Sequence, residues 1–171
     1  MNHVFIVGFM GAGKSTVGRL VADRLGLPFV DLDARIVERA GMRVSEIFDT
    51  RGEHAFRELE SIELEGLRDE PAAVVACGGG VVIRDANRRV LKESGRVAYL
   101  EVTAGEALAR VGDVSSRPLL AHGGPSAAQT LLSARESLYG VVADITVDTV
   151  GRSPDDIALE IVEALASTEG R

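Results

Sequence analysis

A glycine-rich segment near the start of the sequence carries its clearest chemical signal. Residues 8–16 read GFMGAGKST and match the pattern G-x-x-x-x-G-K-[ST], the Walker A phosphate loop. Glycines let backbone N–H groups converge on phosphate oxygens because no Cβ stands in the way. Lys14 can reach the β- and γ-phosphates of a nucleoside triphosphate, and the Ser15 hydroxyl can bind Mg²⁺. We expect the phosphates to contact Gly11, Ala12, Gly13, Lys14, Ser15 and Thr16.

The segments on either side distinguish a phosphate loop from an ordinary glycine-rich turn. Residues 4–7 form an unbroken apolar run, which is typical of a strand buried in a parallel sheet. After the loop, apolar residues recur at helical spacing from Val17 to Leu25, and Gly26 can end that helix. Strand, loop and helix therefore follow one another in the order that a phosphate loop requires.

Two carboxylates, Asp31 and Asp33, follow a short apolar segment at residues 29–30. Ligands of open α/β sheets gather at the carboxyl ends of the strands, and side chains two positions apart on a strand point the same way. The pair could divide two tasks, one near Mg²⁺ and one orienting or deprotonating a hydroxyl. The alternative is that one of them caps the next helix.

The metal needs an acidic partner that the usual position does not supply. Gly78 stands after the third predicted strand, where a Walker B aspartate would be expected, so Asp31 is the nearest candidate. The sequence also lacks the guanine-reading motif N-K-x-D, which disfavours a GTP switch protein.

Three arginines are candidates for binding anions, although each could be an ordinary surface residue. Arg57 lies in a predicted helix, and Glu60, one turn later, could hold its guanidinium rigid. Arg117 lies in a stretch rich in Gly, Pro and Ser, residues 112–125, which we interpret as a mobile loop. From there it could swing over a transferring phosphoryl group as an arginine finger. Arg135, in a later helix, is ambiguous by itself.

The glycine run 78–80 would let a ligand approach the backbone closely at the end of the third strand. We interpret the preceding Cys77 as a small buried strand residue rather than a nucleophile. The histidines His3, His54 and His122 are scattered and indicate neither a metal site nor a catalytic triad.

Strand and helix patterns alternate along nearly the whole sequence. Strands are predicted at residues 4–7, 29–30, 74–77, 97–100 and 145–147. Capping patterns predict helix starts at Thr50–Glu53, Thr103–Glu106 and Ser153–Pro154. The helix after residue 53 should bury Phe56, Leu59, Leu67 and either Ile62 or Glu63. This alternation predicts a three-layer α/β/α sandwich with a five-stranded parallel sheet.

Composition limits the class of protein. The 171 residues, 46% of them hydrophobic and 26% charged, favour a single globular domain over residues 1–171. No apolar run is long enough to span a membrane, and we expect no signal peptide. The single cysteine fits a reducing cytoplasm. A net charge of −7 argues against nucleic-acid or membrane-surface binding, so an anionic substrate would need a local positive field.

Taken together, the motifs resemble the shikimate kinase family in order and spacing over roughly residues 4–150. The matching segments are GFMGAGKS at 8–15, DLD at 31–33, FRELE at 56–60, GGG at 78–80, RPLL at 117–120 and RESLY at 135–139. The phosphate loop is shared by many NTPases, whereas the five further motifs make the resemblance specific.

The resemblance implies a role for each motif. Asp31 would serve Mg²⁺ with Ser15, and Asp33 the shikimate hydroxyls. Arg57, Arg135 and the glycines Gly78, Gly79 and Gly80 would bind shikimate, the arginines through its carboxylate. Lys14, Asp33 and Arg117 would be the catalytic residues, and Arg110, Arg117 and Arg152 would contact ATP, with Arg110 and Arg152 beside the adenine.

The implied reaction is transfer of the ATP γ-phosphoryl group to the 3-hydroxyl of shikimate, by a cytoplasmic monomer of the nucleoside monophosphate kinase-like fold using one Mg²⁺ ion. A substrate-binding segment would span about 33–61 and a lid about 112–125. Whether Asp33 acts as a base or mainly orients the hydroxyl stays open. The alternatives are a related small-metabolite kinase, such as one for gluconate, and a non-catalytic ATP-binding module, although the latter would be expected to have a degraded site.

Overall fold

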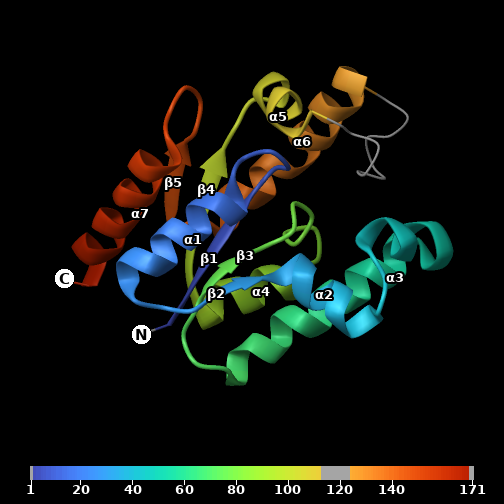
Figure 1. Cartoon of the computed structure of the whole chain (residues 1–171), viewed down its shortest axis with the longest axis horizontal. Coiled ribbons are helices and arrows are strands. Elements are labelled where there is room, and N and C mark those ends of the chain that lie inside the picture. Colours follow the sequence, from blue (N-terminus) through green and yellow to red (C-terminus); the bar gives the residue numbers. More distant parts are fainter. Residues whose placement is uncertain (1, 113–123, 170–171) are drawn as a thin grey trace.

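The computed structural model describes residues 2–112 and 124–169. Within them, five parallel strands form one sheet in the order β2-β3-β1-β4-β5. The strands are β1 (His3–Gly8), β2 (Phe29–Asp31), β3 (Val74–Ala76), β4 (Gly95–Glu101) and β5 (Ile145–Asp148). Helices cover both faces of this sheet (Figure 1), so the predicted three-layer α/β/α sandwich is confirmed.

The central strand β1 shows why the sheet is covered on both sides. All six of its residues are buried, and successive side chains point to opposite faces. Val4 and Ile6 belong to one hydrophobic core, and Phe5 and Val7 to the other. A strand with two buried faces reads as a continuous apolar run, as this one does.

The helices divide between the two cores. On one face α1 (Lys14–Leu25) packs against α7 (Pro154–Glu169), whereas α4 (Asp85–Ser94) contributes to the other core. The helix α6 (Gly124–Val142) contributes to both, through Ala128 and Leu132 on one side and Tyr139 and Val142 on the other. It packs against α5 (Ala104–Val111) near its start and α4 further along.

The segment after β2 forms α2 (Leu32–Ala40), α3 (Val44–Gly66) and the short 3₁₀ helix η1 (Leu67–Asp69). The helices α2 and α3 share a third, smaller core built around Ile36, Ile47 and Phe56. Gly52, at φ 81° and ψ 170°, interrupts α3. Because an L side chain rarely adopts this positive φ, glycine makes the kink possible.

The predicted capping box at Thr50 and Glu53 is wrong, although the chain does restart a helix there. The Thr50 hydroxyl donates to the carbonyl oxygen of Glu46 at 2.6 Å. The Glu53 carboxylate instead accepts from Arg57. Both side chains therefore have partners that a local pattern does not reveal.

Two of the three predicted helix caps are present. The Thr103 hydroxyl accepts from the Glu106 N–H at 3.2 Å, and the Ser153 hydroxyl accepts from the Asp156 N–H at 3.1 Å. Pro154 is the first residue of α7, where its missing N–H costs nothing.

The sequence left open whether Ile62 or Glu63 lies on the buried face of α3, and in the structure it is Glu63. Ile62 is 51% exposed, whereas Glu63 is buried. Its carboxylate accepts from Arg35 at 2.9 Å and also from Arg39, both on α2. The two arginines therefore compensate a charge that would otherwise be costly to bury.

Among the described residues, no helix is long and apolar enough to cross a membrane.

Candidate functional site

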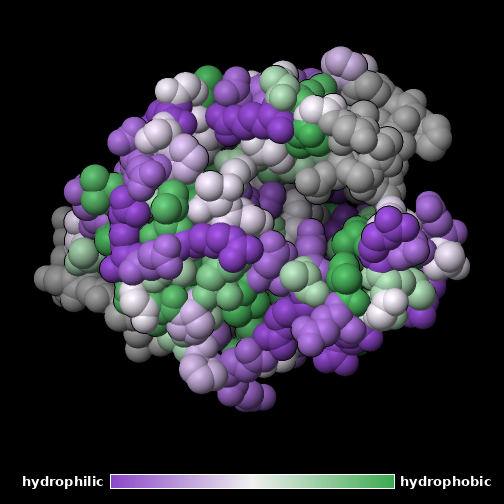
Figure 2. All heavy atoms as spheres, in the orientation of Figure 1, coloured by the Kyte–Doolittle hydropathy of each residue, from purple (hydrophilic) through white to green (hydrophobic). Residues whose placement is uncertain are grey.

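A cavity of about 430 Å³ lies at the carboxyl ends of β1, β2 and β3. Its walls come from the phosphate loop after β1, Asp31 at the end of β2 and Asp33 just beyond it, the glycine run after β3, and from α3 and α6. Figure 2 shows the surface hollowed beside the part of the molecule that α3 forms. The cavity lies where parallel α/β sheets bind their ligands.

The phosphate loop has the backbone form that its glycines predict. Gly11 and Gly13 have positive φ angles of 73° and 90°. A Cβ on Gly11 would lie 2.5 Å from the Ala107 carbonyl oxygen, so a side chain there would also clash. Helix α1 begins at Lys14, which directs its positive N-terminal end toward the loop.

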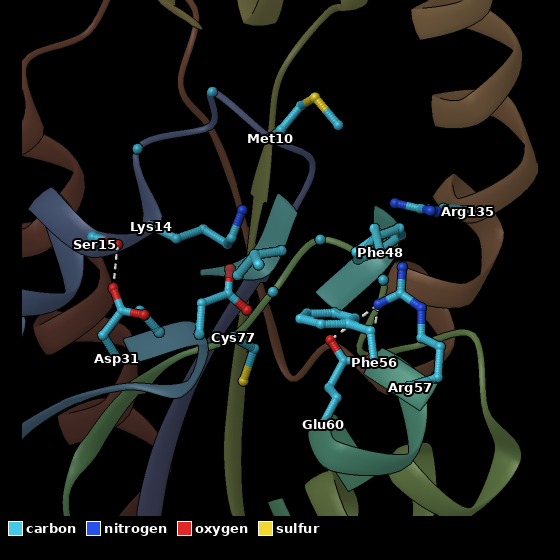
Figure 3. A pocket seen from close by; sticks show the side chains of 18 of the residues that line it. Met10, Lys14, Ser15, Asp31, Phe48, Phe56, Arg57, Glu60, Cys77 and Arg135 are labelled. Atoms are coloured by element: carbon cyan, nitrogen blue, oxygen red, sulfur yellow. Dashed lines mark hydrogen bonds and ion pairs between the residues drawn. The ribbon is translucent and has the colours of Figure 1, made fainter. Parts of the chain in front are cut away.

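Lys14 points into the cavity from the phosphate-loop side (Figure 3). Its ammonium donates to the carbonyl oxygen of Phe9 at 2.9 Å. This contact keeps the charge beside the concave loop, within the same cavity as the aspartates.

Ser15 and Asp31 meet beside the loop. The Ser15 hydroxyl donates to Asp31 Oδ2 at 3.0 Å, while Asp31 Oδ1 accepts from the Ala34 N–H at 3.2 Å. Asp31 therefore caps α2, as the alternative interpretation expected, and it also contacts the loop serine. Its role as a Mg²⁺ ligand stays a prediction.

The donor set around Ser15 suits Mg²⁺. A hydroxyl and a carboxylate lie together beside a phosphate loop, and Mg²⁺ favours oxygen ligands while keeping several waters or phosphate oxygens. No group of three or more His, Cys, Asp or Glu that could hold a metal occurs among the described residues.

Asp33 lines the cavity, but not for the reason inferred from the sequence. The strand ends at Asp31, so Asp33 lies in the first turn of α2 rather than two positions further along a strand. Its Oδ1 lies 2.8 Å from the place where a Cβ on Gly78 would stand. The absence of a side chain at Gly78 gives this carboxylate its room.

Arg57 is buried, with only 7% of its surface exposed. Its Nη1 donates to Glu60 Oε2 at 2.9 Å and to Oε1 at 3.1 Å. Its Nε and Nη2 each lie 3.3 Å from Glu53 Oε1. The predicted Arg57–Glu60 contact is confirmed, and Arg57 is not an ordinary surface residue.

Glu60 is completely buried beneath the cavity. Burial raises the pKa of Glu60 to about 7, while the nearby Arg57 acts in the opposite direction. A carboxyl that titrates near neutrality therefore touches a cavity-lining guanidinium.

Arg135, on α6, is the second buried guanidinium, at 4% exposure. In Figure 3 its head group and that of Arg57 approach the same part of the cavity from two elements. Burial lowers the pKa of Arg135, while the nearby Tyr139 acts in the opposite direction.

The glycine run packs against both guanidinium groups. A Cβ on Gly80 would lie 2.3 Å from the guanidinium atoms of Arg57, and one on Gly79 would lie 3.7 Å from Arg135 Nη1. Two like charges are thus held close together over a backbone without side chains. Such a pair attracts a planar carboxylate, which could accept from both.

A family model described as Shikimate kinase matches residues 10–166. This chain belongs to the shikimate kinase family. A shikimate kinase from Geobacter sulfurreducens is 47% identical, over 94% of this chain and 88% of the relative. One from Pseudomonas fluorescens is 42% identical over the full length of both. The predicted family, and with it a phosphotransferase, is confirmed.

Solved structures agree with this family assignment. The structure of a shikimate kinase from Acinetobacter baumannii, in complex with shikimate, has a TM-score of 0.96 and 36% identity, over all of this chain and 96% of that one. A gluconokinase from Sinorhizobium meliloti has a TM-score of 0.67 at 22% identity, over 98% of this chain and 93% of that one, which shows a shared fold alone.

Two of the arginines expected to contact ATP, Arg110 and Arg152, do not line the cavity. Arg117 and nearly all of the predicted lid lie outside the described residues. Arg110 donates to the Thr149 carbonyl oxygen at 2.8 Å and lies 3.4 Å from the Gly11 carbonyl oxygen, which joins it to the phosphate loop. Arg152 forms an ion pair with Glu160 at 2.7 Å.

Sequence reasoning missed two groups of residues that line or support this cavity. Phe48 and Phe56, whose ring centroids lie 4.9 Å apart, form an apolar wall of the cavity. Their helical spacing indicated burial but not which cavity they line. Glu53 binds Arg57, whereas the sequence pattern predicted a helix cap. Tyr139 lies beside Arg135, whereas in the sequence it was only a member of the motif at 135–139.

Cys77 is buried among the core residues, as expected. Burial raises the pKa of its thiol, which disfavours the reactive thiolate.

Proposed function

We propose that this chain transfers the γ-phosphoryl group of ATP to the 3-hydroxyl of shikimate, giving ADP and shikimate 3-phosphate in chorismate biosynthesis. The observation that carries this proposal is one cavity with a phosphate loop on one side and two buried, adjacent arginines on the other. Membership of the shikimate kinase family supports the same conclusion. Phosphoryl transfer depends mainly on positioning and charge neutralisation, and this cavity offers both.

The donor half is the phosphate loop. Its N–H groups and Lys14 hold the β- and γ-phosphates, with Lys14 leaving the Phe9 carbonyl oxygen for phosphate oxygens. Ser15 and Asp31 hold one Mg²⁺ ion, which neutralises phosphate charge when bound. Gly11, Ala12, Gly13 and Thr16 complete this half.

The acceptor half is the side of the cavity that carries Arg57 and Arg135. It takes residues from the segment 33–61, from the glycine run and from α6. Arg57 and Arg135 bind the shikimate carboxylate, whose negative charge is attracted to these two adjacent buried guanidiniums. The glycines at 78–80 let the ring approach the backbone. Asp33, which lines the cavity, aligns the 3-hydroxyl and accepts its proton in this proposal.

The remaining assignments rest on the family resemblance. Arg117, on a lid at about 112–125, would stabilise the transferring phosphoryl group, and Arg110 and Arg152 would border the adenine. We infer a monomer from the family resemblance and a cytoplasmic location from the single cysteine. We infer no nucleic-acid or membrane partner, because the net charge of −7 disfavours nucleic acids and anionic membranes.

A coupled assay of ADP release tests the function. With ATP and Mg²⁺, we expect ADP when shikimate is added, and little with gluconate or without an acceptor. Lys14→Ala should reduce this rate strongly. Lys92→Ala is the matched control, since Lys92 donates to the Val141 carbonyl oxygen away from the cavity. Absence of shikimate-dependent ADP release would favour a non-catalytic ATP-binding module and overturn the proposal.

A further inference from the structure

Tyr139 lies behind the shikimate side of the cavity and has no role in the reaction described so far. Its side chain is completely buried, and its ring stacks on Tyr99 with 4.9 Å between centroids and 24° between planes. Ring packing alone would be satisfied by phenylalanine. The hydroxyl therefore requires a separate explanation, because a buried polar group is costly without partners.

The hydroxyl joins two parts of the site. It donates its proton to the carbonyl oxygen of Gly79, in the middle of the glycine run. Its oxygen keeps lone pairs, and it lies close enough to the Arg135 guanidinium for each group to shift the pKa of the other. Arg135 lies four residues earlier on the same helix, so the two side chains share one face.

The position of Gly79 extends this link to the second guanidinium. The next residue, Gly80, packs directly against Arg57, and Arg135 lies over Gly79 itself. A shift of the glycine run would therefore change the backbone surface against which both arginines pack. A single hydroxyl therefore anchors the middle of the glycine run and lies beside one of the two arginines.

We propose that Tyr139 is a positioning residue for the acceptor site, whose hydroxyl locks Arg135 and the Gly79 carbonyl in the arrangement that receives the substrate carboxylate. This inference rests on the proposed function, because it takes Arg135 to be a carboxylate ligand. It assigns Tyr139 to acceptor affinity rather than to the phosphoryl-transfer step. Preorganisation of this kind lowers the ordering cost of binding.

The test is Tyr139→Phe, which keeps the stacked ring and removes only the hydroxyl. We expect KM and the calorimetric Kd for shikimate to rise about tenfold, as for a lost hydrogen bond to a charged group. KM for ATP should change less than about twofold, and kcat only modestly. Tyr99→Phe is the matched control, since the Tyr99 hydroxyl makes no hydrogen bond within the described residues.

A merely structural role gives a different pattern. If Tyr139→Phe lowers Tm and impairs both substrates alike, or leaves the affinity for shikimate unchanged, the positioning role is wrong. Combining it with Arg135→Lys adds a second criterion. The double variant should lose less affinity than the product of the two single losses, and a full product would overturn the inference.

The same variants separate the two proposals. If Arg135→Lys leaves shikimate binding unchanged, the assigned role of Arg135 fails and the inference about Tyr139 fails with it. If Arg135→Lys weakens binding and Tyr139→Phe does not, only the inference about Tyr139 fails.

Discussion

At the scale of single residues, the site depends on charges that are buried in pairs. Arg57 and Glu60 form the innermost pair, and Glu60 has no exposed surface at all. Removing one partner of such a pair leaves an uncompensated buried charge, which costs far more than a surface ion pair contributes. The Arg57–Glu60 pair therefore depends on whether Glu60 is protonated, and so on pH.

Glu60 should make stability fall as pH rises. Burial raises its pKa to about 7 from an ordinary value of 4.5, so between these values the folded state holds a proton that the unfolded state has lost. Its contribution is complete below about pH 4.5 and is lost by about pH 7, on the order of 3 kcal/mol.

Urea unfolding at several pH values measures this, with Glu60→Gln as the reference that cannot titrate. The stability of the wild type relative to Glu60→Gln should decline across the range. Parallel pH profiles for the two proteins would show that Glu60 does not titrate there.

Substitution of Asp33 should lower kcat without weakening the binding of ATP. Asp33→Asn keeps the shape of the side chain but cannot accept the hydroxyl proton, so kcat should fall by about 10² or more. ATP binding, measured by calorimetry, should persist because the phosphate loop is intact. Retained turnover in Asp33→Asn would remove Asp33 from proton transfer, and Asp33→Ala would then test orientation alone.

At the scale of elements, the acceptor site is built where the glycine run, α3 and α6 meet. The glycine run matters through the space it leaves, since a Cβ on Gly80 would lie 2.3 Å from the Arg57 guanidinium. The atom it would meet is the far end of a flexible side chain, so the arginine can move while the fold persists.

Gly80→Ala should therefore weaken shikimate binding while sparing ATP. We expect KM for shikimate to rise roughly tenfold, equivalent to about 1.4 kcal/mol, with KM for ATP nearly unchanged. Gly66→Ala is the control, because nothing lies within 4 Å of a Cβ at this helical glycine. Equal steady-state constants for Gly80→Ala and the wild type would contradict the close packing inferred at this position.

The contact between α2 and α3 depends on the buried Glu63. Glu63→Gln should destabilise the fold by about 2 kcal/mol, because Arg35 and Arg39 lose charge-assisted hydrogen bonds to a buried carboxylate. Glu65→Gln, at an exposed position of the same helix, should cost less than about 1 kcal/mol. Thermal or urea unfolding measures both, and equal losses would mean that burial of Glu63 contributes little.

At the scale of the whole molecule, local sequence patterns predicted the layers well. The strand before the phosphate loop is apolar at every position because both faces of β1 are buried, and this is visible in the sequence. Alternating strands and helices then lead to a parallel sandwich, since parallel neighbours need crossover connections. The order of strands, by contrast, depends on pairing between distant segments.

The site was predicted less completely, because its details depend on partners from other elements. The sequence pattern predicted that Glu53 caps a helix, whereas its carboxylate binds Arg57 in the structure. Glu63 is buried because two arginines of α2 bind its carboxylate. Asp33 reached the cavity from a helix instead of a strand, since β2 ends at Asp31. No local pattern reports such competition.

The most direct measurement of the whole molecule's function is a competition between acceptors followed by ³¹P NMR. The wild-type protein would receive ATP, Mg²⁺ and equal concentrations of shikimate and gluconate. We predict one new phosphomonoester signal, coupled to the proton at C3 of shikimate, appearing together with ADP. Formation of phosphogluconate, or of inorganic phosphate without a phosphorylated acceptor, would contradict a cavity built for the shikimate carboxylate.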